Sequence, residues 1–549
     1  MNNNKSLFWV GSEINKEFPT NLPNENELVE YMIEVMYGEY GLQAFQNRIA
    51  AYNSFIHEIN QTIEAVIYPG ILISQWSKIK GINLNAGIAS FLQAPFNGIH
   101  CYLAMILSEG VSIITTNMDL CIEYAYESFM EGTDKLILSE CENGVAIYSG
   151  GRKTSGKVYH IHGSAENSNC LGGTIEIGKD YFSKTFRECV KEWMISDINL
   201  YVVGYNYRDI YDVTMFMSYQ RRQLESVGWK VSIVSTKGKK EQPTSIKVMY
   251  QYFQECQLIH TRAIDFCKEF CLEKRQCSLN ELYESVKQMI SRQQAFLLNW
   301  KQEIKKALCD VGDYKDIILL YMNQSLGVPV CEMDPTIYER LERMSSSYKN
   351  MYTSLMFRYT HDLIPIYGYN MHKNKLLEGN PTFLMEELIR LSQDGYNQRN
   401  SKICNFVKIV EKLQEDYINA LRRRTVTIKW EIEAGKLLQE IEELLPKERG
   451  GRLLELPKNN YREFAQLYRL RAAIKSIYYK EVGSILDVKR DLNRAGTYCS
   501  QSANWHGVLK TVEYASFCYY CFYYKYGKKS YYDKAQRYKT LIKRQKAKE

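Results

Sequence analysis

Polar side chains follow three short apolar runs of this sequence, and each group is placed where it could bind a ligand or act in catalysis. After Ile113 and Ile114, the apolar character stops abruptly at Thr116, Asn117 and Asp119. In a parallel sheet these side chains would project near the carboxyl edge of the strands, where such sheets bind their ligands. The structural alternative is that Asn117 or Asp119 caps the helix that follows.

Two histidines, His160 and His162, end the second run and are followed by Gly163. Side chains two apart on a strand share a face, and the glycine indicates a tight turn that would expose the second imidazole. Two histidines on one face can bind a metal, but no carboxylate or thiol lies at a useful spacing. The structural alternative is a core histidine that bonds to the backbone.

The third run, residues 7–10, ends at Gly11, which Ser12 and Glu13 follow. A strand that runs into a glycine turn lets backbone N–H groups approach a phosphate closely. This segment is therefore a candidate phosphate-binding loop.

The elements that must position these residues alternate between strand and helix patterns in the first half of the chain. Such alternation predicts an α/β fold with a parallel sheet covered on both faces. The expected strands are 6–10, 112–115, 157–161, 199–203 and 230–235, and residues 27–39 and 211–226 have helical spacing.

After about residue 265 no convincing strand pattern remains. Apolar residues recur at three- and four-residue steps over 403–421 and again over 464–478, which is typical of helices that bury one face. We therefore expect an α/β domain at residues 1–265 and an all-α domain at 266–549. Residues 267–292 could pack with either domain.

The composition is that of a folded protein, because 45% of the 549 residues are hydrophobic and 24% are charged. No run approaches the roughly 18 apolar residues of a membrane-spanning helix, and the first residues lack the apolar core of a signal peptide. These features predict a cytoplasmic protein with no membrane partner, whose 15 cysteines are reduced thiols.

The net charge of +7 comes from the end of the chain. Residues 525–549 contain ten Lys and Arg against two Asp and Glu, so the other 524 residues sum to −1. Such a tail can contact nucleic acid or anionic lipid, or it can be a solvated helix with Tyr531, Tyr538 and Leu541 on its apolar face. The run 518–524 contains the one CxxC pair and four tyrosines. We interpret it as helix core or an oligomer contact rather than a zinc or nucleic-acid site.

In their order and spacing, these segments resemble the SIR2 (sirtuin-like) family over residues 5–240. One of them is the TxN-x-D form at Thr115–Asp119. The others are Gly11-Ser12-Glu13-Ile14-Asn15 with Leu22-Pro23, Pro95-Phe96-Asn97-Gly98-Ile99-His100 with Leu103-Ala104 and Leu107, His162-Gly163, and Val202-Val203-Gly204-Tyr205-Asn206-Tyr207-Arg208-Asp209.

The sequence is most similar to the SIR2-like domains of bacterial anti-phage defence proteins, which are NAD+ glycohydrolases. The resemblance implies a Rossmann-like sheet, NAD+ as substrate and no metal. It implies that Asn117 fixes the ribose and the attacking water, that Asp119 bonds the carboxamide and that His162 is the base or a polar orienter. It assigns the remaining contacts with NAD+ to Gly11, Ser12, Thr116, Gly163, Gly204 and Asn206.

Two departures from the family pattern bear on which other functions stay open. Glu13 replaces the second glycine of the phosphate loop, which favours a degenerate module that senses NAD+ or ADP-ribose. The zinc ribbon of the deacylases is missing, which counts against a deacylase, but an NAD+-dependent deacylase or ADP-ribosyltransferase stays an alternative function. Because a constitutive NADase would be toxic, we expect gating through the helical half. The expected partners are further copies of the chain, a sensor protein or a phage-derived trigger, and nucleic acid is not expected.

Overall fold

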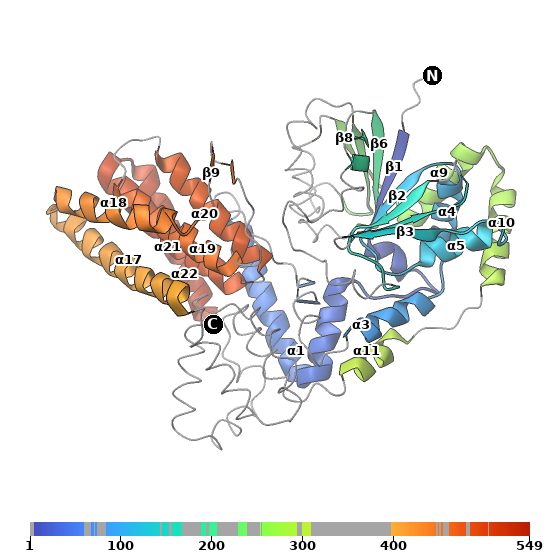
Figure 1. The fold of residues 1–549 in the computed structure, drawn as a ribbon, viewed down its shortest axis with the longest axis horizontal. Helices are drawn as coiled ribbons and strands as arrows, with labels where there is room; N and C mark the ends of the chain where they lie inside the picture. The colour runs from blue at the N-terminus through green and yellow to red at the C-terminus, as the bar shows by residue number, and fades with distance from the viewer. Residues whose placement is uncertain are drawn as a thin grey trace, which may run out of the picture. The chain divides into compact units, whose positions relative to one another are not determined.

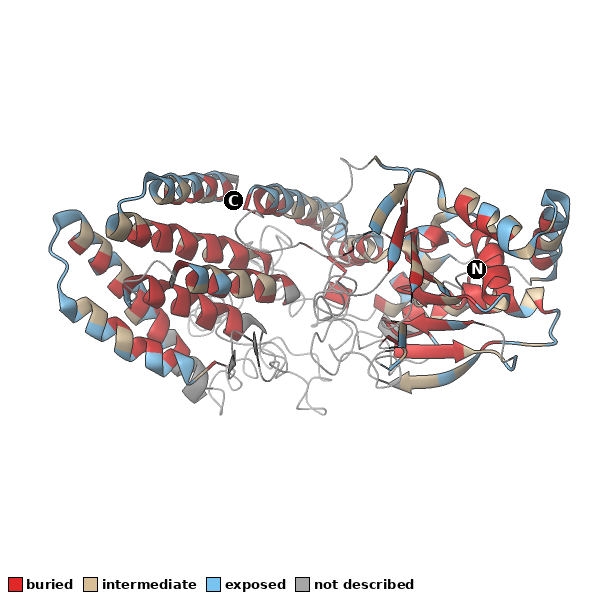
Figure 2. Ribbon diagram, turned by 90° about the horizontal axis from the view of Figure 1, so that it is seen from above, coloured by how far each residue is buried: buried red, intermediate tan, exposed pale blue. Residues whose placement is uncertain are grey.

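The chain divides by its contacts into two compact units (Figure 1), each with a buried interior of its own (Figure 2). The first comprises Met1–Met32 and Leu72–Asp310, and the second comprises Ile33–Ile71 and Val311–Glu549. The computed structural model describes residues 5–59, 67, 69–70, 72–73, 84–142, 145–152, 156–166, 188–190, 192–193, 197–205, 229–238, 253, 255–293, 299–308, 397–445, 448–449, 452–453, 461–478, 484–502 and 504–548. The expected helix at 211–226 lies outside these residues.

An eight-stranded sheet forms the centre of the first unit, in the order β3-β4-β5-β2-β1-β6-β7-β8. From β5 to β8 every neighbouring pair is parallel. Numbered along the chain, these six strands have the order 3-2-1-4-5-6 of a doubly wound dinucleotide-binding sheet. The prediction of a Rossmann-like α/β fold is thus confirmed. The bounds are β1 (Lys5–Val10), β2 (Ser112–Thr115), β5 (Lys157–His160), β6 (Ile198–Val203), β7 (Lys230–Val234) and β8 (Glu255–Ile259).

Two strands at one edge make the sheet mixed rather than wholly parallel. β3 (Ile137–Glu142) and β4 (Val145–Ser149) pair antiparallel with each other, and β4 pairs antiparallel with β5. The sequence analysis did not include them or β8. β3 lies at the edge of the sheet and is partly exposed, as its residue Ile137 shows with an exposed fraction of 55%. A partly exposed strand lacks the continuous apolar run by which buried strands are found.

The central strand β1 is buried on both faces of the sheet. The ring of Phe8 packs 5.0 Å from that of Phe270 on one face. Leu7 and Trp9 belong to an apolar cluster on the other face, together with Leu200 of β6. Burial on both sides explains why the run reads as apolar without alternation.

The helices that follow the sheet belong to the first unit, which differs from the boundary expected at residue 265. α9 (Ala263–Arg275) and α10 (Leu279–Arg292) pack on α4 (Gly98–Ser108), and α11 (Trp300–Leu308) packs on α3 (Leu84–Ala89). The thiol of Cys271 on α9, for example, donates to the carbonyl of Tyr102 on α4 at 3.2 Å. Apolar residues of α9 and α10 are buried by these contacts, which is why 267–292 stays with the sheet.

The described part of the second unit is helical apart from two short paired strands, β9 (Glu448–Arg449) and β10 (Arg452–Leu453). α19, α20 and α21 pack against one another, and α22 packs against α21. The predicted all-α character is confirmed for these residues. The helices are the C-terminal part of α1 (Glu25–Ile59), which is interrupted at Gly38, then α17 (Asn397–Arg423), α18 (Ile428–Glu442), α19 (Tyr461–Tyr478), α20 (Ser484–Gln501), α21 (Trp505–Tyr526) and α22 (Lys529–Lys548).

The tyrosine-rich run lies in α21, and the basic tail forms the amphipathic helix α22 against it. The buried ring of Tyr519 lies 5.8 Å from that of Tyr538, and Leu541 is also buried. Burial raises the pKa of the Cys521 thiol to about 12 and that of Cys518 well above its usual value. Both thiols are buried in the packing of α21, as expected of helix core.

Ten described cysteines are free thiols, as expected, whereas Cys141 forms a disulfide, which corrects the expectation of reduced cysteines throughout. Within the described part of the chain, no helix combines the length and apolar character that crossing a membrane requires.

Candidate functional site

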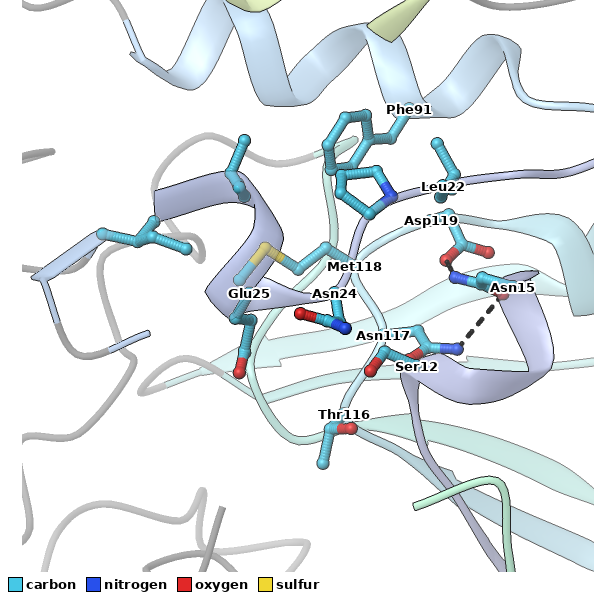
Figure 3. A pocket seen from close by; sticks show the side chains of 13 residues that line it. Ser12, Asn15, Leu22, Asn24, Glu25, Phe91, Thr116, Asn117, Met118 and Asp119 are labelled. Carbon is cyan, nitrogen blue, oxygen red and sulfur yellow. Dashed lines mark hydrogen bonds between the residues drawn. The ribbon is translucent and has the colours of Figure 1, made fainter. Parts of the chain in front are cut away.

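A cleft opens at the carboxyl ends of β1 and β2, where doubly wound sheets bind their ligands. It encloses about 510 Å³, counting the space that is open to solvent. Figure 3 shows polar side chains from both strand ends facing an apolar wall. The lining residues are Ser12, Asn15, Leu22, Pro23, Asn24, Glu25, Leu28, Ile73, Phe91, Thr116, Asn117, Met118 and Asp119.

Asn117 presents its amide oxygen as a buried acceptor. The amide nitrogen Nδ2 lies 3.4 Å from the carbonyl of Gly11 and 3.4 Å from Oδ1 of Asn15. The oxygen Oδ1 is buried and has no hydrogen-bond partner among the described residues. A buried acceptor without a donor is costly, so Asn117 is suited to accept a hydroxyl or amide donor from a ligand.

Asp119 serves both the cleft and the helix that follows it. Its Oδ2 accepts a hydrogen bond of 2.6 Å from Nδ2 of Asn15, and its Oδ1 accepts one of 3.1 Å from the backbone N–H of Cys121. The second bond satisfies the first turn of α5 (Cys121–Phe129). The N-cap of α5 is Leu120, so Asp119 is not the capping residue itself, although it bonds the first N–H of the helix and its carboxylate lines the cleft.

His162 is buried and is not among the described residues that line the cleft. Its Nδ1 lies 3.3 Å from Oε1 of Glu25, which does line the cleft. The imidazole can donate from this nitrogen to the carboxylate of Glu25, which is an acceptor. The sequence analysis did not identify Glu25 as a site residue, because an acidic residue in the first turn of a helix usually only complements the helix dipole.

His160 is a core histidine that holds the backbone of Asn117, as the structural alternative proposed. Its Nδ1 bonds the Asn117 carbonyl at 2.7 Å and its Nε2 bonds Oε1 of Glu123 at 2.8 Å. Both partners are acceptors, so both ring nitrogens donate and the ring is an imidazolium. Burial alone would lower the pKa of His160, but the charge and hydrogen bonds of Glu123 and the Asn117 carbonyl raise it above its ordinary value.

The two histidines do not share a strand face, contrary to the expectation from their spacing. β5 ends at His160, and residues 161–162 form a turn. Gly163 follows with a φ of +78°, which glycine adopts without strain. The tight turn was therefore predicted correctly, but it buries the imidazole of His162 rather than exposing it.

Gly11 and Gly204 let the ends of β1 and β6 approach each other closely. A Cβ on Gly11 would lie 2.5 Å from Cα of Tyr205, and Gly204 has a φ of +59°. The N–H groups of Gly11 and Glu13 donate to the carbonyls of Val203 and Gly204 at 3.1 and 2.9 Å. These two N–H groups are thus engaged within the protein.

The other expected contacts with NAD+ divide into those that line the cleft and those that do not. Ser12 and Thr116 line it. Gly11, Gly163 and Gly204 are not among its lining residues within the described chain, and Asn206 lies outside the described residues. Glu13 is exposed and does not line the cleft either. The contacts of Gly11, Ser12, Thr116, Gly163, Gly204 and Asn206 with NAD+ stay predictions.

Comparison with protein families gives a match that includes one wall of this cleft, at Thr116–Asp119. Residues 111–249 match the family model of the SIR2-like domain, which covers β2 to β7 of the sheet. Over these residues the chain is similar to a SIR2-like domain. This family uses NAD+, so the domain has an NAD+-related function. Searches of curated proteins and of solved structures each found no match.

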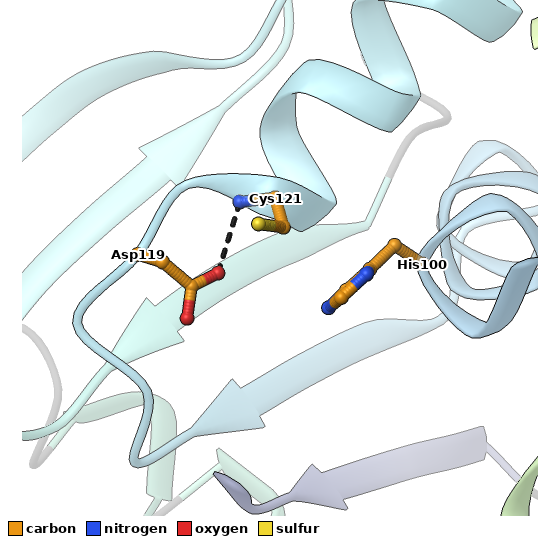
Figure 4. Close-up of side chains that lie close together, drawn as sticks. All are labelled: His100, Asp119 and Cys121. Carbon is orange, nitrogen blue, oxygen red and sulfur yellow. Dashed lines mark hydrogen bonds between the residues drawn. The ribbon is translucent and has the colours of Figure 1, made fainter. Parts of the chain in front are cut away.

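Three potential metal ligands lie close together (Figure 4): His100, Cys121 and Asp119, of which Asp119 also lines the cleft. Nδ1 of His100 accepts the N–H of Asn97 at 3.1 Å, so Nε2 carries the proton and donates to Asn15. His100 therefore has no lone pair left for a cation. Burial raises the pKa of the Cys121 thiol well above its usual value, so that thiol is neutral. The three side chains hold hydrogen bonds in this arrangement, and the absence of a metal stays a prediction.

Proposed function

We propose that the SIR2-like domain binds NAD+ in this cleft and hydrolyses the bond between nicotinamide and ribose. The observation that carries the proposal is the buried, unpartnered amide oxygen of Asn117 at the carboxyl edge of β2. A ribose hydroxyl is a donor of the kind this oxygen lacks. The carboxylate of Asp119, which lines the same cleft, can accept from the amide group of nicotinamide.

The chemistry of this bond suits the residues present. Its cleavage passes through an oxocarbenium-like state, and nicotinamide is a good leaving group, so the protein must mainly position the sugar and activate a nucleophile. In this proposal Glu25 orients the ring of His162 through Nδ1, and the imidazole accepts the proton of water.

The burial of His162 supports gating. The imidazole lies behind Glu25 rather than in the wall of the cleft, so its Nε2 reaches a nucleophile only after a local rearrangement. We further propose that the protein is the effector of a bacterial anti-phage defence system. In this proposal a signal received by the helical unit or by a partner makes that rearrangement favourable, and NAD+ depletion follows.

Binding without turnover is the second candidate function. The same burial of His162 favours it, because a domain whose base never reaches the cleft would still bind NAD+ or ADP-ribose through Asn117 and Asp119. The module would then report the ligand to the helical unit.

One experiment separates the two functions. NAD+ binding is measured by calorimetry on the full-length protein, and nicotinamide and ADP-ribose are measured by chromatography in cells that express it, before and after phage infection. Binding with release of both products supports hydrolysis. Binding with unchanged NAD+ supports the sensing module and contradicts hydrolysis, and the absence of binding contradicts both.

Replacing Glu25 by glutamine should lower kcat by about 10- to 100-fold, which is part of the contribution of a positioned base. The amide no longer stabilises a charged imidazole, so the acidic limb of the kcat/KM profile should move to lower pH. Glu25→Asp should recover part of the rate, and Glu34→Gln, which changes an exposed glutamate of the same helix, should match the wild type. An unchanged pH profile in Glu25→Gln would show that the pair has no part in the reaction.

A further inference from the structure

We propose that His100 and Asn15 are positioning residues that fix which way the amide of Asn117 and the carboxylate of Asp119 face the cleft. The inference rests on the proposed function and adds to it two residues that do not carry out the reaction. Four hydrogen bonds, each with a defined donor, carry the argument from the start of α4 to the cleft.

The first bond sets the tautomer of His100. The backbone N–H of Asn97 can only donate, so Nδ1 of His100 accepts it and Nε2 must carry the ring proton. Burial lowers the pKa of His100 to about 4, against the opposing charge of Asp119. The ring is therefore neutral at neutral pH, with one defined donor.

The second and third bonds set the direction of the Asn15 amide. Nε2–H of His100 lies 3.0 Å from Oδ1 of Asn15, so this amide turns its oxygen toward the ring. Its nitrogen then faces Asp119 and donates to Oδ2 at 2.6 Å. If the Asn15 amide were flipped, its oxygen would face the Asp119 carboxylate and its N–H would face the N–H of His100. Both contacts are repulsive, so the flipped orientation is excluded.

The fourth bond passes this direction on to Asn117. Oδ1 of Asn15 also accepts from Nδ2 of Asn117, whose other acceptor is the carbonyl of Gly11. With the nitrogen between two acceptors, the oxygen of Asn117 is the atom that stays unpartnered. Figure 3 shows Asn15 between Asp119 and Asn117, bonded to both.

The relay is anchored by the helix that supplies His100. Oδ1 of Asn97 accepts the N–H groups of Ile99 and His100, and its Nδ2 donates to the carbonyl of Ile14 at 2.8 Å. This capping box ties the start of α4 to the segment that holds Asn15. Asn97, His100 and Asn15 are all buried, so solvent does not compete for these bonds.

The test compares His100→Leu with His100→Gln in the full-length protein. Leucine removes both bonds of the ring, and kcat/KM for NAD+ should fall by about 100-fold, the cost of a small misplacement of reacting groups. Glutamine can accept from Asn97 and donate to Asn15, so it should recover most of this loss. His260→Leu, at an exposed histidine, is the control. A His100→Leu protein that unfolds at the wild-type temperature and keeps the full rate would overturn the inference.

Asn15→Asp gives a second test, in which the measured quantity is the pH dependence of activity. A merely structural role of Asn15 would leave that pH dependence unchanged. It sets a second carboxyl beside Asp119, and such a pair shares one proton. The protonated form still donates to Asp119, so activity should be at least about 10-fold higher at pH 6 than at pH 8 beyond any wild-type trend. A profile parallel to that of the wild type would contradict the inference.

Nitrogen NMR of histidine-labelled protein separates failure of this inference from failure of the proposed function. The relay requires His100 to stay neutral with its proton on Nε2 between about pH 5 and pH 8, whether or not the protein consumes NAD+. A proton on Nδ1, or titration in this range, would refute the relay even in an active enzyme. If His100 has the expected tautomer but the protein does not bind NAD+, the relay is supported and the proposed function is contradicted.

Discussion

Replacing Asn117 by alanine should lower kcat/KM for NAD+ by about 100- to 1,000-fold, the usual cost of removing one positioned polar group from an active site. The amide oxygen is the buried acceptor offered to the ligand, and alanine removes it without adding bulk. The two bonds made by Nδ2 are long, at 3.4 Å each, so little stability should be lost with them. The rate is measured as nicotinamide release by the activated protein.

The controls separate this loss from a general effect of substitution. Asn280→Ala removes an exposed asparagine of the same unit and should leave the rate unchanged. His162→Ala should also abolish turnover while NAD+ binding survives, because the imidazole does not line the cleft. Nicotinamide release at the wild-type rate in a folded Asn117→Ala protein would remove Asn117 from the site.

The cleft could be predicted from the sequence because buried parallel strands leave a strong signal at their ends. An apolar run without alternation, such as residues 112–115, marks a strand covered on both faces, and the polar residues after it must then emerge at the carboxyl edge. That reasoning correctly placed Thr116, Asn117 and Asp119 in the wall of the cleft. It also placed Ser12 there, from the end of the neighbouring strand.

The partners of these residues could not be predicted in the same way. Glu25 meets His162 across 137 positions, and His100 meets Asn15 across 85. No local pattern records such a contact, because it depends on how the loops after β1 and before α4 pack. His100 and Asn15 lie within segments that resemble the family. Their proposed positioning role, however, follows from the tautomer of the buried His100 ring, which the sequence does not reveal.

The two histidines illustrate the same limit. Their spacing predicted a shared face, which holds only while the strand continues, and β5 ends between them. As a result His160 stays in the core and His162 enters a turn. The strands at the edges of the sheet were missed for a related reason, since partial exposure removes the apolar pattern by which buried strands are found.

Replacing His160 by leucine should lower the free energy of unfolding by about 3–5 kcal/mol, because it leaves the buried carboxylate of Glu123 without its partner. Oε2 of Glu123 already has no hydrogen-bond partner among the described residues, so His160 is the main source of compensation. The measurement is denaturant unfolding of both proteins at pH 7. A loss below about 1 kcal/mol would show that the pair is not ionised.

The pair also predicts how stability depends on pH. The groups that face His160 are Glu123 from α5, Asp119 from the preceding loop and the ring of Tyr148 from β4. Because they raise its pKa above the ordinary 6.5, the folded protein keeps a proton that the unfolded chain releases above that value. The stabilisation is therefore fully present below pH 6.5 and is lost as the pH rises through the folded-state pKa.

The double variant His160→Leu, Glu123→Met separates stability from positioning. It removes both charges together, and apolar replacement of a buried ion pair is often neutral or stabilising, so most of the lost stability should return. The wild type should then lose stability relative to it as the pH rises above 6.5 and through the raised pKa of His160. Activity should stay low, because the carbonyl of Asn117 no longer receives the 2.7 Å hydrogen bond of His160. Recovery of the full rate along with the stability would mean that His160 stabilises the fold without positioning Asn117.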